Sequence, residues 1–125
     1  MSVRRSIPNY DGLYFITITC CRWLHLFELV SAYDVVYKWF DYLKNKGHYI
    51  TGYVIMPNHL HALIAFQHTE GVSINNIVGN GKRFMAYALV SKLEELNKQD
   101  VLAELSSYVN ETERQRYKRH EVFEP

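Results

Sequence analysis

The sequence predicts an α+β domain in which helices cover one face of an antiparallel sheet. Three observations lead to this prediction. The chain has 125 residues, the usual size of one domain. Several short runs are β-branched and aromatic, and longer segments repeat apolar residues at helical spacing. Only Pro57-Asn58 separates two of the strand-like runs, a link so short that it predicts an antiparallel hairpin.

The strands are expected in the runs richest in isoleucine, valine, threonine and aromatic residues. The first spans residues 13–20, where threonine alternates with isoleucine after the turn signal Asp11-Gly12. The hairpin consists of residues 49–56 and 59–66. The segment 121–125 has the composition of a fourth strand that is only beginning.

The first helix is expected over residues 31–46, where apolar side chains recur at helical spacing. Ser31 and Asp34 resemble a capping box, in which each side chain bonds a free backbone N–H at the start of the helix. Gly47 is expected to end this helix, because glycine readily adopts the left-handed conformation found after helix C-termini.

A second helix is expected to begin after Ser73 and to continue to about Leu96. Gly79 and Gly81 interrupt it, which indicates a kink or the close approach of another group, such as a DNA backbone. Asp100 is expected to cap a further helix. The order is then strand, helix, two strands and helix, with a partial strand at the end. This order matches the ferredoxin-like βαββα(β) arrangement.

Charge and cysteine content exclude several classes of protein. The chain has 14 Lys and Arg against 13 Asp and Glu, so its net charge of +1 excludes nucleic-acid binding by bulk charge alone. Phosphate contacts would have to come from local patches, of which Arg4-Arg5 is one. The neighbouring Cys20 and Cys21 do not suggest a disulfide framework. With no signal peptide and no apolar run long enough for a membrane span, a cytoplasmic location is expected.

His59 and His61 are the residues whose spacing carries most chemical information. They lie two positions apart in an expected strand, so both imidazoles should project from the same face of the sheet. Neighbouring imidazoles on a rigid surface form half of a binding site for a divalent metal ion. The spacing alone is weak evidence for metal, because two partly exposed surface histidines are the commoner reason for such a pair.

The residues around this pair resemble a known family. The run from Met56 to His61, Met-Pro-Asn-His-Leu-His, resembles the HUH motif of IS200-like and REP-associated tyrosine transposases. The strand at 14–19 and the helix that contains Lys82 and Arg83 are similar to elements of the same family. The resemblance covers roughly residues 10–97, and its chain order is the one expected above.

This resemblance implies a metal-dependent transposase that cleaves and rejoins single-stranded, hairpin-forming DNA. It implies that His59 and His61 hold Mg²⁺ or Mn²⁺, and that a tyrosine forms a 5′-phosphotyrosine intermediate. It also implies a possible homodimer. The expected DNA contacts are four cations: Lys82, Arg83, Arg114 and Arg116. Trp23, Tyr33 and Trp39 are aromatic residues able to stack on bases, although Trp39 is interpreted as helix packing.

The nucleophile is not matched. In the family the tyrosine lies on a helix after the fourth strand, and this sequence ends at the expected fourth strand. Tyr117 is nearest by position but precedes that strand, and an exposed aromatic residue in a basic segment is the simpler interpretation. The expectation is therefore a single domain, residues 1–125, truncated before the catalytic helix. Such a chain would bind metal and DNA without cleaving efficiently.

Two other functions are compatible with the sequence. One is a non-catalytic relative that recognises DNA hairpins. The other is an α+β interaction domain that dimerises through its sheet, with His59 and His61 incidental to its function. Metal affinity separates these possibilities. A transposase or its non-catalytic relative should bind a divalent metal ion through His59 and His61, whereas the interaction domain has no need of one.

Overall fold

The computed structural model describes residues 11–125, and its centre is a three-stranded antiparallel sheet. The hairpin of β2 (Tyr49–Met56) and β3 (His59–Phe66) is formed as predicted, and β1 (Gly12–Thr19) pairs with the other side of β3. The strand order is therefore β1-β3-β2, with β3 in the middle. The predicted α+β class with an antiparallel sheet is confirmed.

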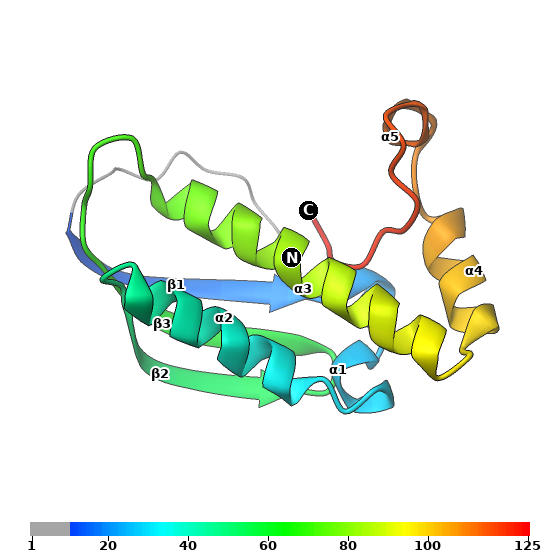
Figure 1. Cartoon of the computed structure of the whole chain (residues 1–125), viewed down its shortest axis with the longest axis horizontal. Helices are drawn as coiled ribbons and strands as arrows, with labels where there is room; N and C mark the ends of the chain where they lie inside the picture. Colours follow the sequence, from blue (N-terminus) through cyan, green and yellow to red (C-terminus); the bar gives the residue numbers. More distant parts are fainter. Residues whose placement is uncertain (1–10) are drawn as a thin grey trace.

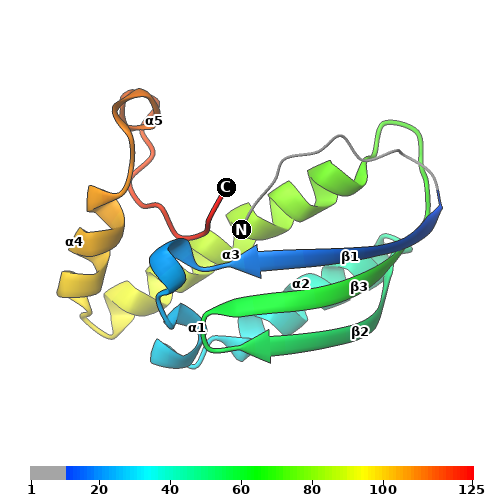
Figure 2. The ribbon, with the colours of Figure 1, turned by 180° about the vertical axis from the view of Figure 1, so that it is seen from behind.

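The two long helices lie on the same face of this sheet. α2 (Tyr33–Asn45) connects β1 to β2, and α3 (Ile74–Glu95) follows β3 (Figure 1). Viewed from behind, the sheet lies in front of both helices and presents its other face (Figure 2). The residues that form the core between the sheet and the helices are fully or nearly buried, among them Ile18, Trp39, Leu43, Leu60, Ile64, Met85 and Leu89.

Gly81 explains how closely the two helices pack. A Cβ atom at this position would overlap the indole ring of Trp39, whereas a Cβ at Gly79 would meet nothing within 4 Å. The expected interruption is wrong, because α3 is continuous over 22 residues. Glycine at position 81 accommodates a tryptophan of the neighbouring helix, and the approach of a DNA backbone is not needed to explain it.

The start of α3 is as predicted and the start of α2 is not. The Ser73 hydroxyl accepts a hydrogen bond from the Asn76 N–H at 3.0 Å, as an N-cap should. The capping box at Ser31 and Asp34 is wrong. Ala32 occupies the N-cap position without a side-chain hydrogen bond, and Ser31 has φ +49°. The Ser-x-x-Asp pattern lies one residue too early, so the Ser31 side chain does not cap this helix.

The end of α2 is also as predicted, whereas the start of α4 is not. Gly47 adopts φ +89° just after α2, which confirms the predicted glycine stop. The helix α4 (Gln99–Ser107) begins before Asp100, and Lys98 occupies its N-cap position. Asp100 therefore lies in the first turn, where its negative charge complements the helix dipole, and the prediction that it is the cap is wrong.

The helical pattern did not reveal three short elements. A 3₁₀ turn, η1 (Cys21–Trp23), and the one-turn helix α1 (Leu26–Leu29) connect β1 to α2. A short helix, α5 (Glu111–Gln115), lies in the charged segment after α4. None is long enough to show the 3.6-residue repeat on which the prediction depends.

The C-terminal segment, residues 116–125, follows α5 and packs against the end of β1. Residues 121–125 do not form the expected strand, because only an isolated antiparallel bridge joins Cys20 to Phe123. Two backbone hydrogen bonds flank the bridge: Cys21 N–H to Val122 C=O at 2.7 Å, and Glu124 N–H to Thr19 C=O at 2.8 Å. The sheet is thus extended beside β1 at one end only.

Cys20 and Cys21 are free, as expected from the sequence, and the structure shows that both are buried. Burial raises the pKa of the Cys20 thiol to about 12 and that of Cys21 to about 11, so both are protonated at neutral pH. Among the helices of residues 11–125, none has the length and apolar character needed to cross a membrane.

Candidate metal centre and nucleic-acid interface

His59 and His61 share the face of β3 that the helices leave uncovered. Both are half-buried, whereas Leu60 and Ala62 between and beyond them are buried on the helix side. Their ring centroids lie 4.7 Å apart. The predicted same-face arrangement of the two imidazoles is therefore confirmed, and its metal-binding role stays a prediction.

Each imidazole has a polar partner at Nδ1. The Nδ1 atom of His59 lies 2.7 Å from Asn58 Oδ1, and that of His61 lies 2.9 Å from Thr17 Oγ1. An amide oxygen can only accept, which assigns the proton of neutral His59 to Nδ1. The same tautomer at His61 makes the Thr17 hydroxyl the acceptor. In this arrangement both Nε2 atoms keep their lone pairs for a ligand.

The electrostatic environment favours neutral imidazoles. Burial, followed by the proximity of His61, lowers the pKa of His59 below its ordinary value of 6.5. A metal ion competes with protons for the same nitrogen lone pair, so a lowered pKa keeps His59 available at neutral pH.

The residues present fit a divalent cation with an incomplete set of protein ligands. In residues 11–125, no group of three or more His, Cys, Asp or Glu side chains is placed to hold a metal ion. Water and substrate oxygens would have to complete the coordination shell around His59 and His61. Mg²⁺ prefers oxygen ligands and a nearly complete hydration shell, so two nitrogen ligands suit Mn²⁺ better.

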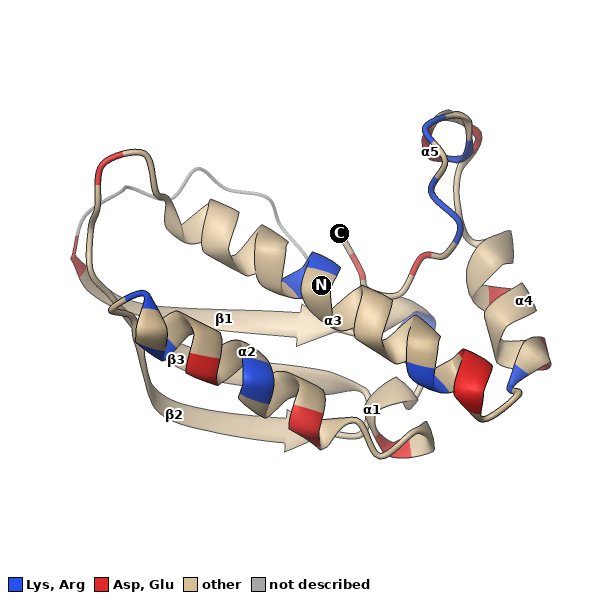
Figure 3. Cartoon of the chain, viewed as in Figure 1, with Lys and Arg blue, Asp and Glu red and all other residues tan. Residues whose placement is uncertain are grey.

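Two exposed aromatic rings flank the histidines. Phe15 stacks on His61 with ring centroids 5.3 Å apart, and Trp23 meets His59 edge to face at 5.8 Å. Their side chains are 65% and 54% exposed, respectively. The three strands contain no Lys, Arg, Asp or Glu, so the sheet is uncharged apart from any charge on its histidines (Figure 3).

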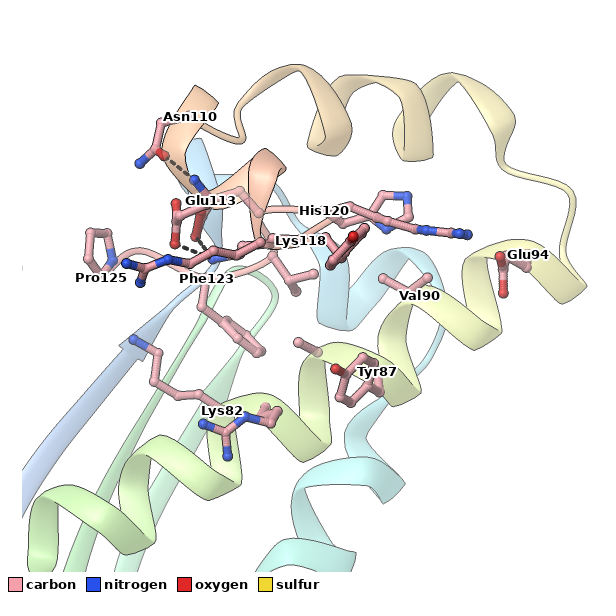
Figure 4. A pocket seen from close by; sticks show the side chains of 17 residues that line it. Lys82, Tyr87, Val90, Glu94, Asn110, Glu113, Lys118, His120, Phe123 and Pro125 are labelled. Carbon is pink, nitrogen blue, oxygen red and sulfur yellow. Dashed lines mark hydrogen bonds and ion pairs between the residues drawn. The ribbon is translucent and has the colours of Figure 1, made fainter.

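The charged candidates lie elsewhere, in a groove between α3 and the C-terminal segment. This C-terminal groove has a volume of about 910 Å³ (Figure 4). Three of the four predicted DNA contacts line it: Lys82 and Arg83 from α3, and Arg116, which follows α5. Arg119 lines it as well. Arg114 does not line the groove; its guanidinium group donates hydrogen bonds to backbone carbonyls at the end of α4.

Several cations of the C-terminal groove already have partners. Lys82 Nζ donates to the Glu124 carbonyl at 2.7 Å, which ties α3 to the C-terminal segment. Lys118 lies 2.9 Å from the Glu121 carboxylate and 3.2 Å from that of Glu113. Arg116 and Arg119 are both exposed, which leaves them better placed to meet phosphates.

Tyr117 lines the same groove. Its side chain is 91% exposed, and its backbone has φ +69°. The residues that line the C-terminal groove do not include His59 or His61. The structure therefore places the proposed nucleophile in a groove that neither proposed metal ligand lines.

The remaining aromatic and basic candidates lie in different surroundings. Trp39 is 2% exposed in the core, which confirms its interpretation as packing, and Tyr33 is partly buried against the same core. Arg4-Arg5 lies outside the described residues. Of the three proposed stacking residues, Trp23 is the one that the structure places beside the histidines.

Sequence reasoning did not identify Phe15 as a neighbour of the histidine pair, nor Thr17 as a partner. Both belong to β1, and their positions depend on its register, in which Thr17 is opposite His61 and Phe15 is opposite Leu63. From the sequence, the adjacent Asn58 is expected only in the turn of the hairpin. Its position just before His59 was the one signal of a local hydrogen bond that the sequence offered.

Comparisons with protein-family models, with characterised proteins and with solved structures find no match to this chain. A functional assignment therefore depends on the histidine pair, its neighbouring rings and the C-terminal groove.

Proposed function

We propose that this chain binds single-stranded DNA in a metal-dependent manner and is related to the IS200-like transposases. The observation that carries the proposal is the pair His59 and His61, side by side on an uncovered sheet face with Nδ1 of each imidazole held by a neighbour. Mn²⁺ or Mg²⁺ is the cofactor that the proposal assigns to them.

A ferredoxin-like topology is part of this proposal. It is supported by the order β1-α2-β2-β3-α3 and by the bridge that joins Phe123 to Cys20 beside β1. A strand that continued from this bridge would lie next to β1, which would complete the βαββαβ arrangement.

Different residues of the chain would have different roles in binding the metal ion and the DNA. Asn58 and Thr17 would hold the imidazoles through Nδ1, which leaves Nε2 of His59 and of His61 for a ligand. A divalent cation held by His59 and His61 would offset the negative charge of a DNA phosphate and orient it. Arg83 and Arg116 would hold phosphates of the same DNA farther along its backbone.

Cleavage by the described residues is not part of the proposal. Tyr117 is the candidate nucleophile from the sequence, but it lines a groove from which both metal-ligand candidates are absent. An unactivated tyrosine hydroxyl, with a pKa of about 10, is a weak nucleophile at neutral pH. We therefore expect binding of hairpin-bearing DNA without efficient strand cleavage.

Metal titration tests the proposal directly. Isothermal titration with Mn²⁺ should give a site that His59→Ala and His61→Ala each remove, while the exposed His68→Ala leaves it unchanged. Unchanged Mn²⁺ affinity in both site variants would contradict the proposal. The protein should then be incubated with Mn²⁺ and hairpin-bearing single-stranded DNA. A covalent adduct that Tyr117→Phe abolishes would contradict the expectation of binding without cleavage.

A dimerising interaction domain is the second candidate. Its supporting observation is the exposure of apolar side chains on the open sheet face, with Leu13 65%, Val54 52% and Met56 41% exposed. Sedimentation equilibrium separates it from the first candidate. A stable dimer that Val54→Asp dissociates, in a protein with no affinity for Mn²⁺, would favour the interaction domain.

A further inference from the structure

The open sheet face carries a row of four rings in the order Trp23, His59, His61, Phe15. The successive centroid distances are 5.8, 4.7 and 5.3 Å. We propose that Phe15 and Trp23 are stacking platforms for two nucleobases of a DNA single strand, one on each side of the phosphate that the histidine pair receives. This inference rests on the proposed function and adds the residues that position the strand.

The absence of charge on the strands favours a single strand over a duplex. A duplex presents phosphates on its outside, and its binding depends on lysine and arginine side chains. β1, β2 and β3 contain none of these residues, nor any Asp or Glu. A single strand can instead turn its bases toward the protein, where aromatic rings stack on them without regard to sequence. The face therefore suits bases, with one phosphate at its polar centre.

Backbone strain at Trp23 is the second observation. Arg22 and Trp23 have φ +56° and +58°, so two consecutive residues with side chains adopt the left-handed conformation. Such a conformation is costly outside glycine and persists only where surrounding contacts enforce it. More than half of the Trp23 side chain is exposed, so core packing does not explain why a large ring is kept there.

One local contact and two contacts from distant parts of the chain hold this turn. The Arg22 N–H donates to a Glu124 carboxylate oxygen at 2.7 Å, and the Arg22 guanidinium group lies 4.6 Å from the centroid of the Tyr108 ring. The Trp23 N–H donates to the Cys20 carbonyl at 3.0 Å. The C-terminal segment and α4 therefore hold the turn that sets Trp23 beside His59.

Fluorescence titration of the 125-residue chain with oligothymidylate, in the presence of saturating Mg²⁺, tests the stacking itself. Trp23 should be quenched, while the buried Trp39 supplies a constant background. Polarisation of a labelled oligothymidylate then gives the affinities of Phe15→Ala and Trp23→Ala. Each should be weaker by about 5- to 150-fold, the expected range for loss of one stacked base. The control is Tyr42→Ala, which removes a similarly exposed ring from α2.

Two further variants at position 23 separate stacking from folding. Trp23→Phe should retain most of the affinity, because it keeps a ring. Trp23→Gly removes the ring and also relieves the positive φ, so it should weaken binding without lowering the melting temperature. Loss of affinity that follows a lower melting temperature in every variant would overturn the inference.

The outcomes also separate this inference from the metal centre. Wild-type affinity in both Phe15→Ala and Trp23→Ala would overturn the stacking role and leave the metal site intact. Weakened DNA binding in these variants, in a protein whose Mn²⁺ affinity does not depend on His59 or His61, would support stacking and refute the metal centre. A change in sedimenting mass without any change in DNA affinity would instead make the face a surface for a second copy of the chain.

Discussion

In the proposed function, the open sheet face and the C-terminal groove would hold a nucleic acid in two different ways. The face is built from regular strands, contains no Lys or Arg, and places two histidines between exposed aromatic rings. The groove is formed by one side of α3 and an irregular segment, and it is lined by several cations and by Tyr87 and Tyr117. We propose that the first receives bases and a metal-bound phosphate, and that the second receives the phosphate backbone.

The two regions should differ in how strongly their binding depends on salt. Stacking on the face does not release counterions, whereas each phosphate contact in the groove does. The two regions should therefore respond differently to salt, to metal and to substitution.

We expect the greatest loss of stability from a substitution in α3, the element that supports both regions. Gly81→Ala places a methyl group inside the Trp39 indole ring, so α2 and α3 must separate. We expect a loss of about 1–3 kcal/mol in the free energy of unfolding, which denaturant titration measures. Gly79→Ala is the matched control. It adds a methyl group in open space and should stabilise the helix by about 0.5–1 kcal/mol. A similar loss in both variants would contradict the packing role of Gly81.

The next effect concerns the open face alone. Thr17→Val removes the oxygen that lies 2.9 Å from His61 Nδ1 while keeping the shape of the side chain. Loss of such an orienting partner should weaken Mn²⁺ binding by about 10- to 100-fold. Thr51→Val is the control, because Thr51 donates weakly to a backbone carbonyl and contacts neither histidine. Equal metal affinity in the two variants would show that Thr17 does not orient His61.

The groove should govern the dependence on salt. Arg116→Ala, which removes an exposed cation of the groove, should reduce the slope of log affinity against log salt by about 1. Phe15→Ala should lower the affinity and leave that slope unchanged. Arg114→Ala is a control for charge alone, because Arg114 lies outside the groove and bonds backbone carbonyls. An identical slope in wild type and Arg116→Ala would remove the groove from the binding surface.

The smallest expected effect is a loss of stability in acid that involves neither binding region. His48 is buried against Phe66 and its Nδ1 accepts the Gln67 N–H, and burial lowers its pKa from 6.5. The unfolded chain therefore takes up a proton at a higher pH than the folded chain does. The stability contributed by neutral His48 is complete above pH 6.5 and decreases as the pH falls toward the lowered pKa.

Melting temperatures at about pH 7.5 and pH 5.5 measure this effect. His48→Phe should reduce the difference between the two temperatures, while the exposed His68→Ala should not. Some acid sensitivity should persist, because burial also lowers the pKa of His59 and of His120. An unchanged difference in His48→Phe would show that His48 is not a source of the acid sensitivity.

The parts of the fold that depend on local patterns could be predicted from the sequence. The period of two in β3 places His59 and His61 on one face, the short link fixes the hairpin, and Ser73 caps α3 by a bond within three residues. Each feature depends on residues that are close together in the chain.

The parts that depend on distant residues could not be predicted. The role of Gly81 requires Trp39 of another helix, and the strained turn at Trp23 requires Glu124 from the far end of the chain. Lys82 and Arg116 line one groove only because the C-terminal segment folds back toward α3. Tertiary contacts of this kind leave no periodic signal in a single sequence.

Nuclear magnetic resonance of the six histidine side chains during Mn²⁺ titration would identify the histidines that bind the ion. A paramagnetic ion held by His59 and His61 should broaden the ring signals of both at the lowest metal concentrations. The signals of His25, His48, His68 and His120 should persist at those concentrations. Uniform broadening of all six signals, or earlier loss of any of the other four, would contradict the metal centre on the open sheet face.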